Sequence, residues 1–405
     1  MNTFDDIIPR RGTGCVKWDE CSDAEVLPLW VADMDFAVAP CIQHAIRKRA
    51  EHPVFGYTKV SEDYYNAVIN WFGNRHGWTI KRDSILYTIG VVPAISCCLQ
   101  AITLPGQRVL ISTPVYNCFF SSVCNSGCQI AENPLRRRSD GYYEFDFDDF
   151  ERQCADEKTV AYVLCNPHNP VGRVWRRDEL QRIADICARH HVFVISDEIH
   201  NELVMPGYKY TPFATVNTEG LRYCVCISAS KSFNIAGLQM ANIVCEDPQM
   251  RQRIDRVINI NEVCDVNPFA PVATIAAYSD DGAEWIDSLN QYMYNNYLTI
   301  KEILAPYSDA VTLLPLEGTY LAWLDCTPLC SRMNINSEQL ADALVSEAKV
   351  FFTAGSHYGS PGEDFLRINM ACPQSILREA LTRFTGWMKK YFFSLNSTAD
   401  AIIKK

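Results

Sequence analysis

Short apolar runs that alternate with helical patterns constrain the fold of this chain more than any other feature. Five runs in the middle of the chain are rich in Val, Ile and Cys and barely alternate in polarity. These candidate strands cover residues 109–113, 160–165, 192–196, 223–228 and 242–245. Runs of this kind are typical of strands in a mostly parallel sheet that is buried on both faces.

A helical pattern lies between two of these runs. Within residues 178–191, Leu180, Ile183, Ala184 and Cys187 fall at i, i+3, i+4 and i+7, which is one face of a helix. Strand, helix and strand in this order predict βαβ units. We therefore expect an α/β domain whose central sheet is covered by helices on both faces.

The C-terminal third predicts a smaller α+β domain. Its expected elements are a long helix, two strands and a last helix, over residues 284–304, 320–325, 365–369 and 377–389. Asn336 can cap a further helix that runs through Val345, because Gln339 follows three residues later. The full length of 405 residues is enough for two or three domains.

Charge and hydropathy exclude several classes of function. The chain has 37 Lys and Arg against 48 Asp and Glu, a net charge of -11, and no basic run, so we expect no binding to nucleic acid. No apolar run of about 18 residues occurs, so no transmembrane helix is expected. The first residues lack the pattern of a secretory signal. We therefore expect a cytoplasmic protein without a membrane partner.

The chain has 18 cysteines, which require an interpretation. No Cys-x-x-Cys pair occurs, and the closest groupings, such as Cys224 two residues before Cys226, have no histidines at zinc-finger spacing. In a long chain without a signal sequence we expect reduced thiols that act as small buried apolar residues. No metal site is expected.

Polar side chains follow three successive strands where each strand is expected to end. Residues 166–172 read Asn-Pro-His-Asn-Pro-Val-Gly, residues 197–200 read Asp-Glu-Ile-His, and residues 228–234 read Ser-Ala-Ser-Lys-Ser-Phe-Asn. In open α/β sheets, ligands bind beyond the carboxyl ends of the strands. The sequence therefore predicts a functional site at this edge of the sheet.

Lys231 is the central candidate within these clusters. A lysine at a strand end can form a Schiff base with a carbonyl cofactor, and the neighbouring serine hydroxyls suit phosphate oxygens. An aspartate such as Asp197 is the usual protein partner of a pyridinium nitrogen. A single lysine is more often a solvated surface charge, but the clusters at the other two strand ends favour a functional role here.

Further motifs are spread along almost the whole chain, from Asp5 to about Pro373. Beside the three strand ends they lie at residues 10–13, 16–19, 29–36, 56–58, 90–94, 113–116 and 365–369. With them the chain resembles the pyridoxal 5'-phosphate enzymes of fold type I, in the class I/II aminotransferase superfamily. The stretch Trp-Val-Ala-Asp-Met-Asp-Phe and Asp-Glu-Ile-His make it most similar to the MalY/PatB group of cystathionine β-lyases and C–S β-lyases.

This resemblance implies pyridoxal 5'-phosphate as the cofactor and a role for each matching residue. Lys231 is implied to form the Schiff base and to move the proton at Cα, and Asp197 to pair with the pyridine nitrogen. Asn169 and His200 are implied to lie near the ring oxygen. Tyr116 is implied to stack on the ring, although a core aromatic residue is the alternative.

The resemblance also implies a phosphate site built from hydroxyls and backbone N–H groups. The residues are Ser228, Ser230, Val91 and Val92. A helix that starts after Gly90 presents free N–H donors and the positive end of its dipole to an anion. Many members of the superfamily carry an arginine eight residues after the lysine, where this chain has Gln239. More of the phosphate charge must therefore be balanced by hydroxyls, N–H groups and the dipole.

Three residues are implied to complete the site. Tyr57 is implied to reach the phosphate of a neighbouring subunit, which requires a homodimer with shared active sites; a surface turn after Gly56 is the alternative. Arg367 is implied to hold the substrate α-carboxylate through two parallel hydrogen bonds, rather than forming a surface salt bridge. Backbone around Val31 is expected to close over that carboxylate.

The resemblance implies a large cofactor-binding domain, a smaller domain and β-elimination. We expect an N-terminal arm and part of the small domain in residues 1–50, the large domain in 51–285 and the C-terminal small domain in 286–405. Cystathionine or a cysteine S-conjugate would give a thiol, pyruvate and ammonia. An aminotransferase is the first alternative, since both reactions need the same deprotonated substrate. A regulatory protein-binding role beside the lyase activity is the second.

Overall fold

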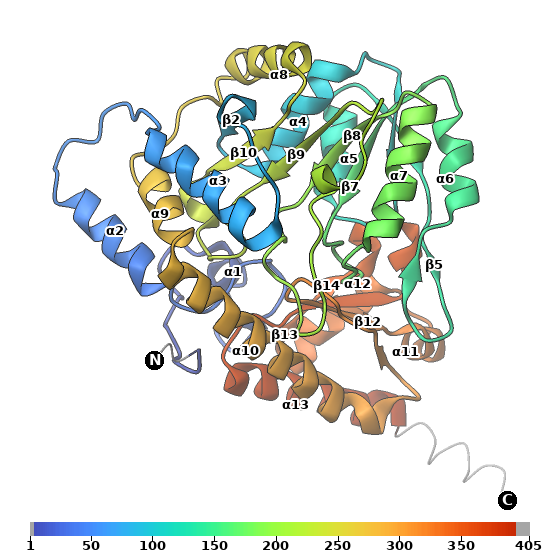
Figure 1. The fold of residues 1–405 in the computed structure, drawn as a ribbon. Helices are drawn as coiled ribbons and strands as arrows, with labels where there is room; N and C mark the ends of the chain where they lie inside the picture. Colours follow the sequence, from blue (N-terminus) through green and yellow to red (C-terminus); the bar gives the residue numbers. More distant parts are fainter. Residues whose placement is uncertain (1–3, 394–405) are drawn as a thin grey trace, which may run out of the picture.

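A sheet of seven strands forms the centre of the larger part of the molecule (Figure 1). The computed structural model describes residues 4–393. The strand order is β2 (Ile85–Thr88), β10 (Ala241–Val244), β9 (Tyr223–Ile227), β8 (Phe193–Asp197), β7 (Thr159–Cys165), β3 (Arg108–Ile111) and β4 (Gln129–Glu132). Only β10 runs antiparallel to its neighbours. The predicted mostly parallel sheet is confirmed, and the five predicted strands match within two residues at each end.

The two outermost strands, β2 and β4, do not follow from the sequence pattern. Each has four residues, and β4 exposes its first and last side chains, Gln129 and Glu132. A strand this short at a sheet edge has few buried side chains. It therefore lacks the long apolar run that identifies the inner strands.

Helices cover both faces of this sheet (Figure 1). The helices α4 (Val91–Ile102), α5 (Cys118–Asn125) and α8 (Pro248–Ile260) pack on one face, and α6 (Phe147–Cys154) and α7 (Arg177–Arg189) on the other. Along β7, Ala161 and Val163 point to the first face, whereas Tyr162 and Leu164 point to the second. Because both faces are buried, consecutive residues of each inner strand are apolar.

Four further helices connect the large sheet with the rest of the chain. They are α2 (Pro40–Ala50), α3 (Glu62–His76), α9 (Ala270–Ala277) and the long α10 (Asp280–Leu304). Helix α10 starts four residues before the predicted residue 284 because Ser279 caps it, with its hydroxyl accepting from Gly282 N at 3.3 Å. No helix among residues 4–393 combines the length and apolarity that crossing a lipid bilayer requires.

A second, antiparallel sheet lies in the C-terminal part, below the large sheet in Figure 1. Its strands are β11 (Thr312–Leu313), β12 (Leu321–Asp325), β15 (Phe365–Asn369) and β14 (Thr353–Ala354), and its helices are α11 (Thr327–Met333), α12 (Ser337–Ala343) and α13 (Gln374–Met388). Asn336 and Gln339 form the predicted capping box of α12. The α-helix ends at Ala343 and a π-helical turn, Leu344–Ala348, follows where the sequence predicts continued α-helix to Val345.

The N-terminal segment joins this C-terminal part. Strand β1 (Leu27–Pro28) pairs in parallel with β13 (Val350–Phe351). The remaining short elements are α1 (Val16–Asp19) and the antiparallel pair of β5 (Arg136–Arg137) and β6 (Tyr143–Glu144). The β1–β13 pairing agrees with a small domain shared by the two ends of the chain. The domain boundaries stay a prediction, and residues 1–3 and 394–405 of the outer segments lie outside the described residues.

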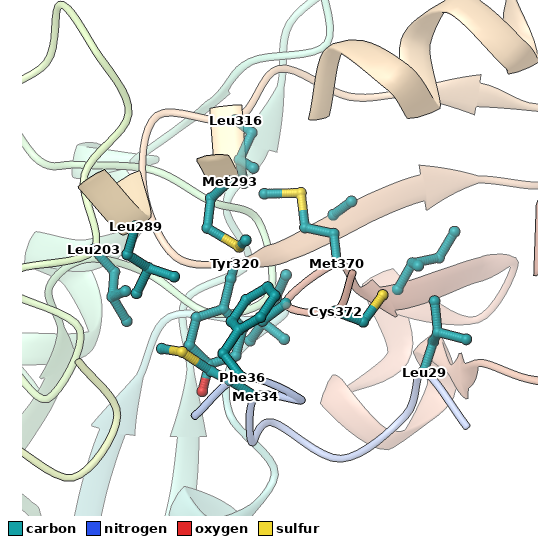
Figure 2. Packing of buried hydrophobic residues seen from close by; sticks show 14 of the residues in the cluster. Leu29, Met34, Phe36, Leu203, Leu289, Met293, Leu316, Tyr320, Met370 and Cys372 are labelled. Atoms are coloured by element: carbon teal, nitrogen blue, oxygen red, sulfur yellow. The ribbon is translucent and has the colours of Figure 1, made fainter. Parts of the chain in front are cut away.

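One apolar cluster connects the N-terminal segment, the loop after β8, α10 and the C-terminal part (Figure 2). Its labelled members are Leu29, Met34, Phe36, Leu203, Leu289, Met293, Leu316, Tyr320, Met370 and Cys372. All ten are buried. The cluster therefore fixes residues 29–36 against both parts of the molecule, and residues 30–32 of this stretch form one wall of the cavity described next.

Candidate active site

The three predicted polar clusters meet at the carboxyl end of the large sheet. Strands β7, β8 and β9 are parallel neighbours, so their ends lie at the same edge. Asp197 is the last residue of β8, and its carbonyl accepts from the backbone N–H of Asn166 at 2.9 Å, just beyond β7. Lys231 follows four residues after the end of β9. The arrangement of the ends is the one predicted for a ligand site.

A cavity of about 660 Å³ opens beside these strand ends. Four of the predicted site residues line it, namely Val31, Tyr116, Lys231 and Arg367. The wall also includes Trp30, Ala32, Cys118, Phe351 and Tyr358, with Glu338, Asp342 and His357 at exposed positions. Its size is in the range of small-molecule sites.

Lys231 points into this cavity as a weakly basic amine. Its Nζ donates to the carbonyl of Ala32 at 2.6 Å. Burial, and secondarily the nearby Arg367 guanidinium, lowers the pKa of Lys231 from 10.5 to about 8, although Asp33, Cys118 and Asp197 oppose this shift. A substantial fraction of a lysine with this pKa is neutral near pH 7 to 8, and a neutral amine can act as a nucleophile or a base.

Asp197 is a buried carboxyl group that forms no salt bridge with the residues that the structure describes. Burial, and secondarily the Cys226 thiol, raises its pKa to about 8, whereas the N–H of Ile199 and the Lys231 amine lower it. Ile199 N donates to Asp197 Oδ1 at 3.1 Å. A cationic ring nitrogen bound at this position would stabilise the carboxylate and keep its own proton.

Arg367 lies on β15 with its guanidinium buried. Nη1 donates to Asn169 Oδ1 at 3.2 Å and Nη2 to the carbonyl of Trp30 at 2.8 Å. Its Nε is buried and has no partner within the described part of the chain. Neither contact is with a carboxylate, so this is no surface salt bridge, and the charge is available to an anionic group in the cavity.

His200 and Asn169 border the same region from the ends of β8 and β7. Burial lowers the pKa of His200 to about 3, with Lys231 and Arg367 adding to the effect, so the imidazole is neutral. Its Nδ1 is buried and lacks a hydrogen-bond partner among residues 4–393. A buried polar atom normally has a partner. The His200 ring therefore has a hydrogen bond to offer to a bound group.

None of the four predicted phosphate residues lines this cavity. Ser228 Oγ donates to the carbonyl of Met240 at 2.6 Å and accepts from Ser230 N at 3.0 Å, and the two hydroxyls lie 2.9 Å apart. Val91 and Val92 are the first residues of α4, and no side chain caps this helix at Gly90. The first N–H groups of α4 are therefore free to bind an anion.

Tyr57 is the predicted site residue that stays fully exposed in the single chain. It lies in the segment between α2 and α3, its side chain is 98% exposed, and it does not line the cavity. Tyr116, by contrast, lies at the cavity wall, and burial raises its pKa well above the usual value, so the phenol stays neutral.

Residues 24–384 match the family model for class I and II aminotransferases. The chain belongs to this family. Among curated relatives, it is 38% identical to the cystathionine beta-lyase PatB of Bacillus subtilis, over 94% of this chain and 98% of PatB, and 34% identical to the protein MalY of Escherichia coli, over 94% and 97%.

Solved structures of similar proteins agree with the family assignment. Cystalysin from Treponema denticola, whose structure contains pyridoxal 5'-phosphate, superposes with a TM-score of 0.91 and 34% identity, covering 96% of this chain and 99% of cystalysin. A C–S lyase from Staphylococcus hominis bound to the same cofactor gives a TM-score of 0.89 and 30% identity over 96% and 99% of the two chains. The fold-type-I architecture is therefore shown.

The residues present fit the cofactor of such aminotransferase-family proteins. Lys231 supplies an amine of lowered pKa, Asp197 a buried carboxylate for a ring nitrogen, and His200 an unpartnered ring atom. The uncapped start of α4 supplies N–H donors for a phosphate. The chain thus presents a group of matching chemistry for the carbonyl, the ring nitrogen and the phosphate of such a cofactor.

Several residues that position the site carry no predicted role. Asn234 Nδ2 donates to the carbonyls of Met34 and Phe36 at 3.0 Å each, and Asn369 Nδ2 donates to those of Val31 and Asp33 at 2.5 and 2.6 Å. These two amides hold residues 31–36 beside Lys231. A signal for Asn234 exists in the sequence, since it ends the Ser-Ala-Ser-Lys-Ser-Phe-Asn cluster.

A second missed group supports the same segment from behind. Asp35 accepts from Lys17 Nζ at 2.8 Å, from Arg10 Nη1 at 2.6 Å and from Trp18 Nε1 at 2.7 Å. Lys17 is fully buried. The N-terminal motifs at residues 10–13 and 16–19 therefore act through the wall of the cavity and contribute no side chain to the cavity itself.

Proposed function

We propose that this protein is a pyridoxal 5'-phosphate-dependent C–S β-lyase that acts on cystathionine or related L-cysteine S-conjugates. In the net reaction, water and the amino acid give a thiol, pyruvate and ammonium, with no other reactant. The observation that carries the proposal is one cavity lined by both Lys231 and Arg367 in a chain 38% identical to a cystathionine beta-lyase.

Arg367 would orient the substrate. An amino acid presents a planar carboxylate, and a guanidinium binds such a group through two parallel hydrogen bonds. The partners that Arg367 has in the free protein are a carbonyl and an amide, which are weaker acceptors than a carboxylate. Backbone of residues 30–32 lies next to it and would shield the bound carboxylate from water, because Trp30, Val31 and Ala32 line the same cavity.

Lys231 would hold the cofactor and then move the proton at Cα. When bound, the cofactor joins to amino groups as a Schiff base and delocalises the electron pair left at Cα after proton loss. The lowered pKa of Lys231 suits this work, since a general base is most effective when its pKa lies near the working pH. Asp197 would keep the ring nitrogen protonated through its negative charge.

The neutral side chains around the ring would complete its binding. His200 offers its unpartnered ring nitrogen, and Asn169 its amide, to the ring oxygen. Tyr116 would stack on the ring, and Ser228, Ser230 and the N–H groups of Val91 and Val92 would bind the phosphate. A neutral His200 next to Lys231 and Arg367 avoids a third positive charge at this end of the cavity.

The test of the proposal is pyruvate release without a keto acid. Purified protein loaded with pyridoxal 5'-phosphate and given cystathionine should form pyruvate and a free thiol in equal amounts. Lys231→Ala should abolish this release. Product that forms only when 2-oxoglutarate is supplied would contradict the lyase assignment.

Transamination remains the competing activity at the same site. It is favoured by the family model itself, and the relatives of this chain include one named a putative aminotransferase, YugH of Bacillus subtilis, at 26% identity. The two activities separate after loss of the Cα proton. Loss of the Cβ substituent leads to pyruvate without a second substrate, whereas amino-group transfer needs a keto acid to receive the amino group, so the dependence on a keto acid distinguishes them.

We also propose a homodimer and a cytoplasmic location. A fully exposed Tyr57, in a segment whose neighbours Val54 and Phe55 are also exposed, supports a partner surface there. All 18 cysteines are free thiols, which supports a reducing compartment.

A further inference from the structure

Three buried thiols from two elements come together inside the large sheet domain. Cys98 lies on α4, and Cys224 and Cys226 lie two residues apart on β9, so both β9 side chains face α4. Their sulfur atoms all lie within 4.8 Å of one another, and the Sγ atoms of Cys98 and Cys224 are 3.5 Å apart. All three residues are at most 1% exposed. This group is called the thiol triad below.

The triad has the dimensions of a three-sulfur binding site. With bonds of about 2.3 Å, the length of a zinc–thiolate bond, three sulfurs around one atom lie roughly 3.5 to 4 Å apart. The observed separations match this range with small side-chain movements. Among residues 4–393, no other group of three potential metal ligands comes together in this way.

The surroundings decide which central atom such a site can hold. The neighbours of the triad in the core are apolar, including Val91, Ile95 and Ile243. An ionisable group, the Asp197 carboxyl, lies close enough for Cys226 to raise its pKa. A divalent cation on three thiolates would leave one net negative charge, and a monovalent cation two, in an apolar core beside a carboxyl group. Burying an unpaired charge is costly.

A trivalent metalloid leaves no charge. We propose that the thiol triad is a binding site for arsenic(III) or a similar trivalent metalloid. One arsenous acid molecule, As(OH)3, reacts with three thiols to give As(S)3 and three waters. Three As–O bonds break, three As–S bonds form, each thiol proton leaves in a water molecule, and no atom changes its oxidation state.

The protonation states of the three residues are compatible with this exchange. Burial raises the pKa of Cys224, and its two thiol neighbours raise that of Cys98, so both are thiols. Hydrogen bonds from Cys224 and Cys98 lower the pKa of Cys226 to about 5, so Cys226 is a thiolate near pH 7. Exchange with As(OH)3 uses this thiolate and two thiols, and one proton taken up from solvent completes the third water. A metal cation would need the two remaining thiols to release protons against their raised pKa values.

The position of the triad connects it to the catalytic end of the sheet. Cys226 pairs in register with Asp197 across β9 and β8, and its carbonyl accepts from Glu198 N at 2.9 Å. Drawing the three sulfurs onto one atom would pull β9 toward α4. Because Asp197 lies on the neighbouring strand, this movement should disturb the site, so arsenite should inhibit the enzyme. The inhibition should be slow, because arsenite can enter only when the buried site opens.

Arsenite binding to the cofactor-loaded protein, in a phosphine reductant, is the test. The expected result is one arsenic atom with three sulfur neighbours in X-ray absorption, and a native mass gain of one arsenic minus three hydrogens. Cys98→Ala and Cys226→Ala should each weaken binding about 100-fold, because one of three tethered ligands is lost. Cys98→Ser is the second variant if the alanine protein does not fold.

The matched control is Cys187→Ala. Cys187 is equally buried and lies next to the Cys154 thiol, so the variant also removes one thiol from a buried group. It should keep the three-sulfur arsenic site. Three results would each overturn the proposal. They are an arsenic atom with only two sulfur neighbours, binding of arsenite by Cys98→Ala as tight as by the parent protein, and tighter binding of Cd²⁺ than of arsenite to the triad. The binding readouts do not depend on the lyase reaction, so failure of the proposed function leaves this test intact.

Discussion

Lys231 and Asp197 owe their shifted pKa values to the same cause, burial at the carboxyl end of the sheet. Burial disfavours the charged form of each, so the pKa of Lys231 falls to about 8 and that of Asp197 rises to about 8. A bound ring that carries one positive charge would relieve Asp197. The two residues are therefore a site prepared for a cofactor that forms a covalent bond at one end and needs a carboxylate at the other.

The lowered pKa of Lys231 predicts how cofactor uptake depends on pH. Only a neutral amine attacks an aldehyde, and raising the pH removes the proton. The rate at which cofactor-free protein takes up pyridoxal 5'-phosphate should rise with pH and level off above about 8, the pKa of Lys231. A lysine with an ordinary pKa would continue to gain rate up to about 10.4. The growth of the absorbance band of the bound cofactor measures this rate.

Arg367 and Arg378 supply the variants for this experiment. Arg367 lowers the pKa of Lys231, so Arg367→Gln should move the midpoint to higher pH. The Arg378 side chain is 47% exposed, and Arg378→Gln should leave the midpoint unchanged. A rate that still rises at pH 10 in the parent protein, or an unchanged midpoint in Arg367→Gln, would contradict the proposed state of Lys231.

Residues at strand ends could be predicted from the sequence because position along the chain determines where they lie. Asp197 ends and Lys231 follows a strand that the apolar runs identify, and Arg367 lies within another. Asn369 and Tyr320 could not be assigned a role in this way. Tyr320 donates to the carbonyl of Ala32, 288 residues away in the chain, and Asn369 donates to that of Val31, 338 residues away. A contact over such a separation leaves no local pattern in the sequence.

At the scale of elements, the N-terminal segment is the part that the sequence describes least. The motifs at residues 10–19 and 29–36 carry the family resemblance, yet their physical role becomes visible only in the fold. Arg10, Lys17 and Trp18 converge on Asp35, and Asn234 and Asn369 hold the other side of the segment. A single irregular segment is thereby fixed between the large sheet and the C-terminal part (Figure 2).

The buried ion pair of this segment predicts a large loss of stability in Asp35→Asn. Asp35 is 3% exposed and its partner Lys17 is fully buried, so the variant leaves a buried ammonium whose nearest carboxylate is Asp33, 3.8 Å away. Breaking a buried pair in this way costs about 3–5 kcal/mol of the free energy of unfolding. Urea denaturation at pH 7 measures the loss.

Asp33→Asn is the matched control for that variant. Asp33 also accepts from Arg10, but its side chain is 25% exposed and it lies 3.8 Å from the Lys17 amine. The expected loss is about 1 kcal/mol or less, as for partly exposed pairs. Equal losses in the two variants would show that the buried pair does not stabilise this segment more than the exposed one.

At the scale of the whole molecule, the fold can be judged within one subunit, whereas the role of Tyr57 depends on a second subunit. The α/β class, the central sheet and the second sheet follow from apolar periodicity and are confirmed. Tyr57 does not reach the cavity of its own chain, and its segment between α2 and α3 stays exposed (Figure 1). A contact made only in a dimer cannot be seen in one subunit, so the role of Tyr57 stays a prediction.

Mixed dimers test that role directly. Lys231→Ala and Tyr57→Ala proteins should each have little activity alone. If Tyr57 serves the partner's site, dimers exchanged between the two variants contain one site with both residues intact. Activity should then recover to about a quarter of the parent value, because half of the dimers are mixed and each has one complete site.

Mixing Lys231→Ala with Asp197→Ala is the control for this complementation. Both residues belong to the same site of the same chain, so every site in a mixed dimer stays defective and no activity should return. Recovery in this control, or no recovery with Tyr57→Ala, would show that the sites are not shared in the proposed way.

The central claim is that Lys231 holds pyridoxal 5'-phosphate at the carboxyl end of the sheet. Borohydride reduction of the cofactor-loaded protein, followed by peptide mapping, tests it most directly. We predict one covalent cofactor per chain, attached to Lys231, and none in Lys231→Ala. A reduced cofactor on another lysine, or no covalent cofactor after loading, would contradict the account.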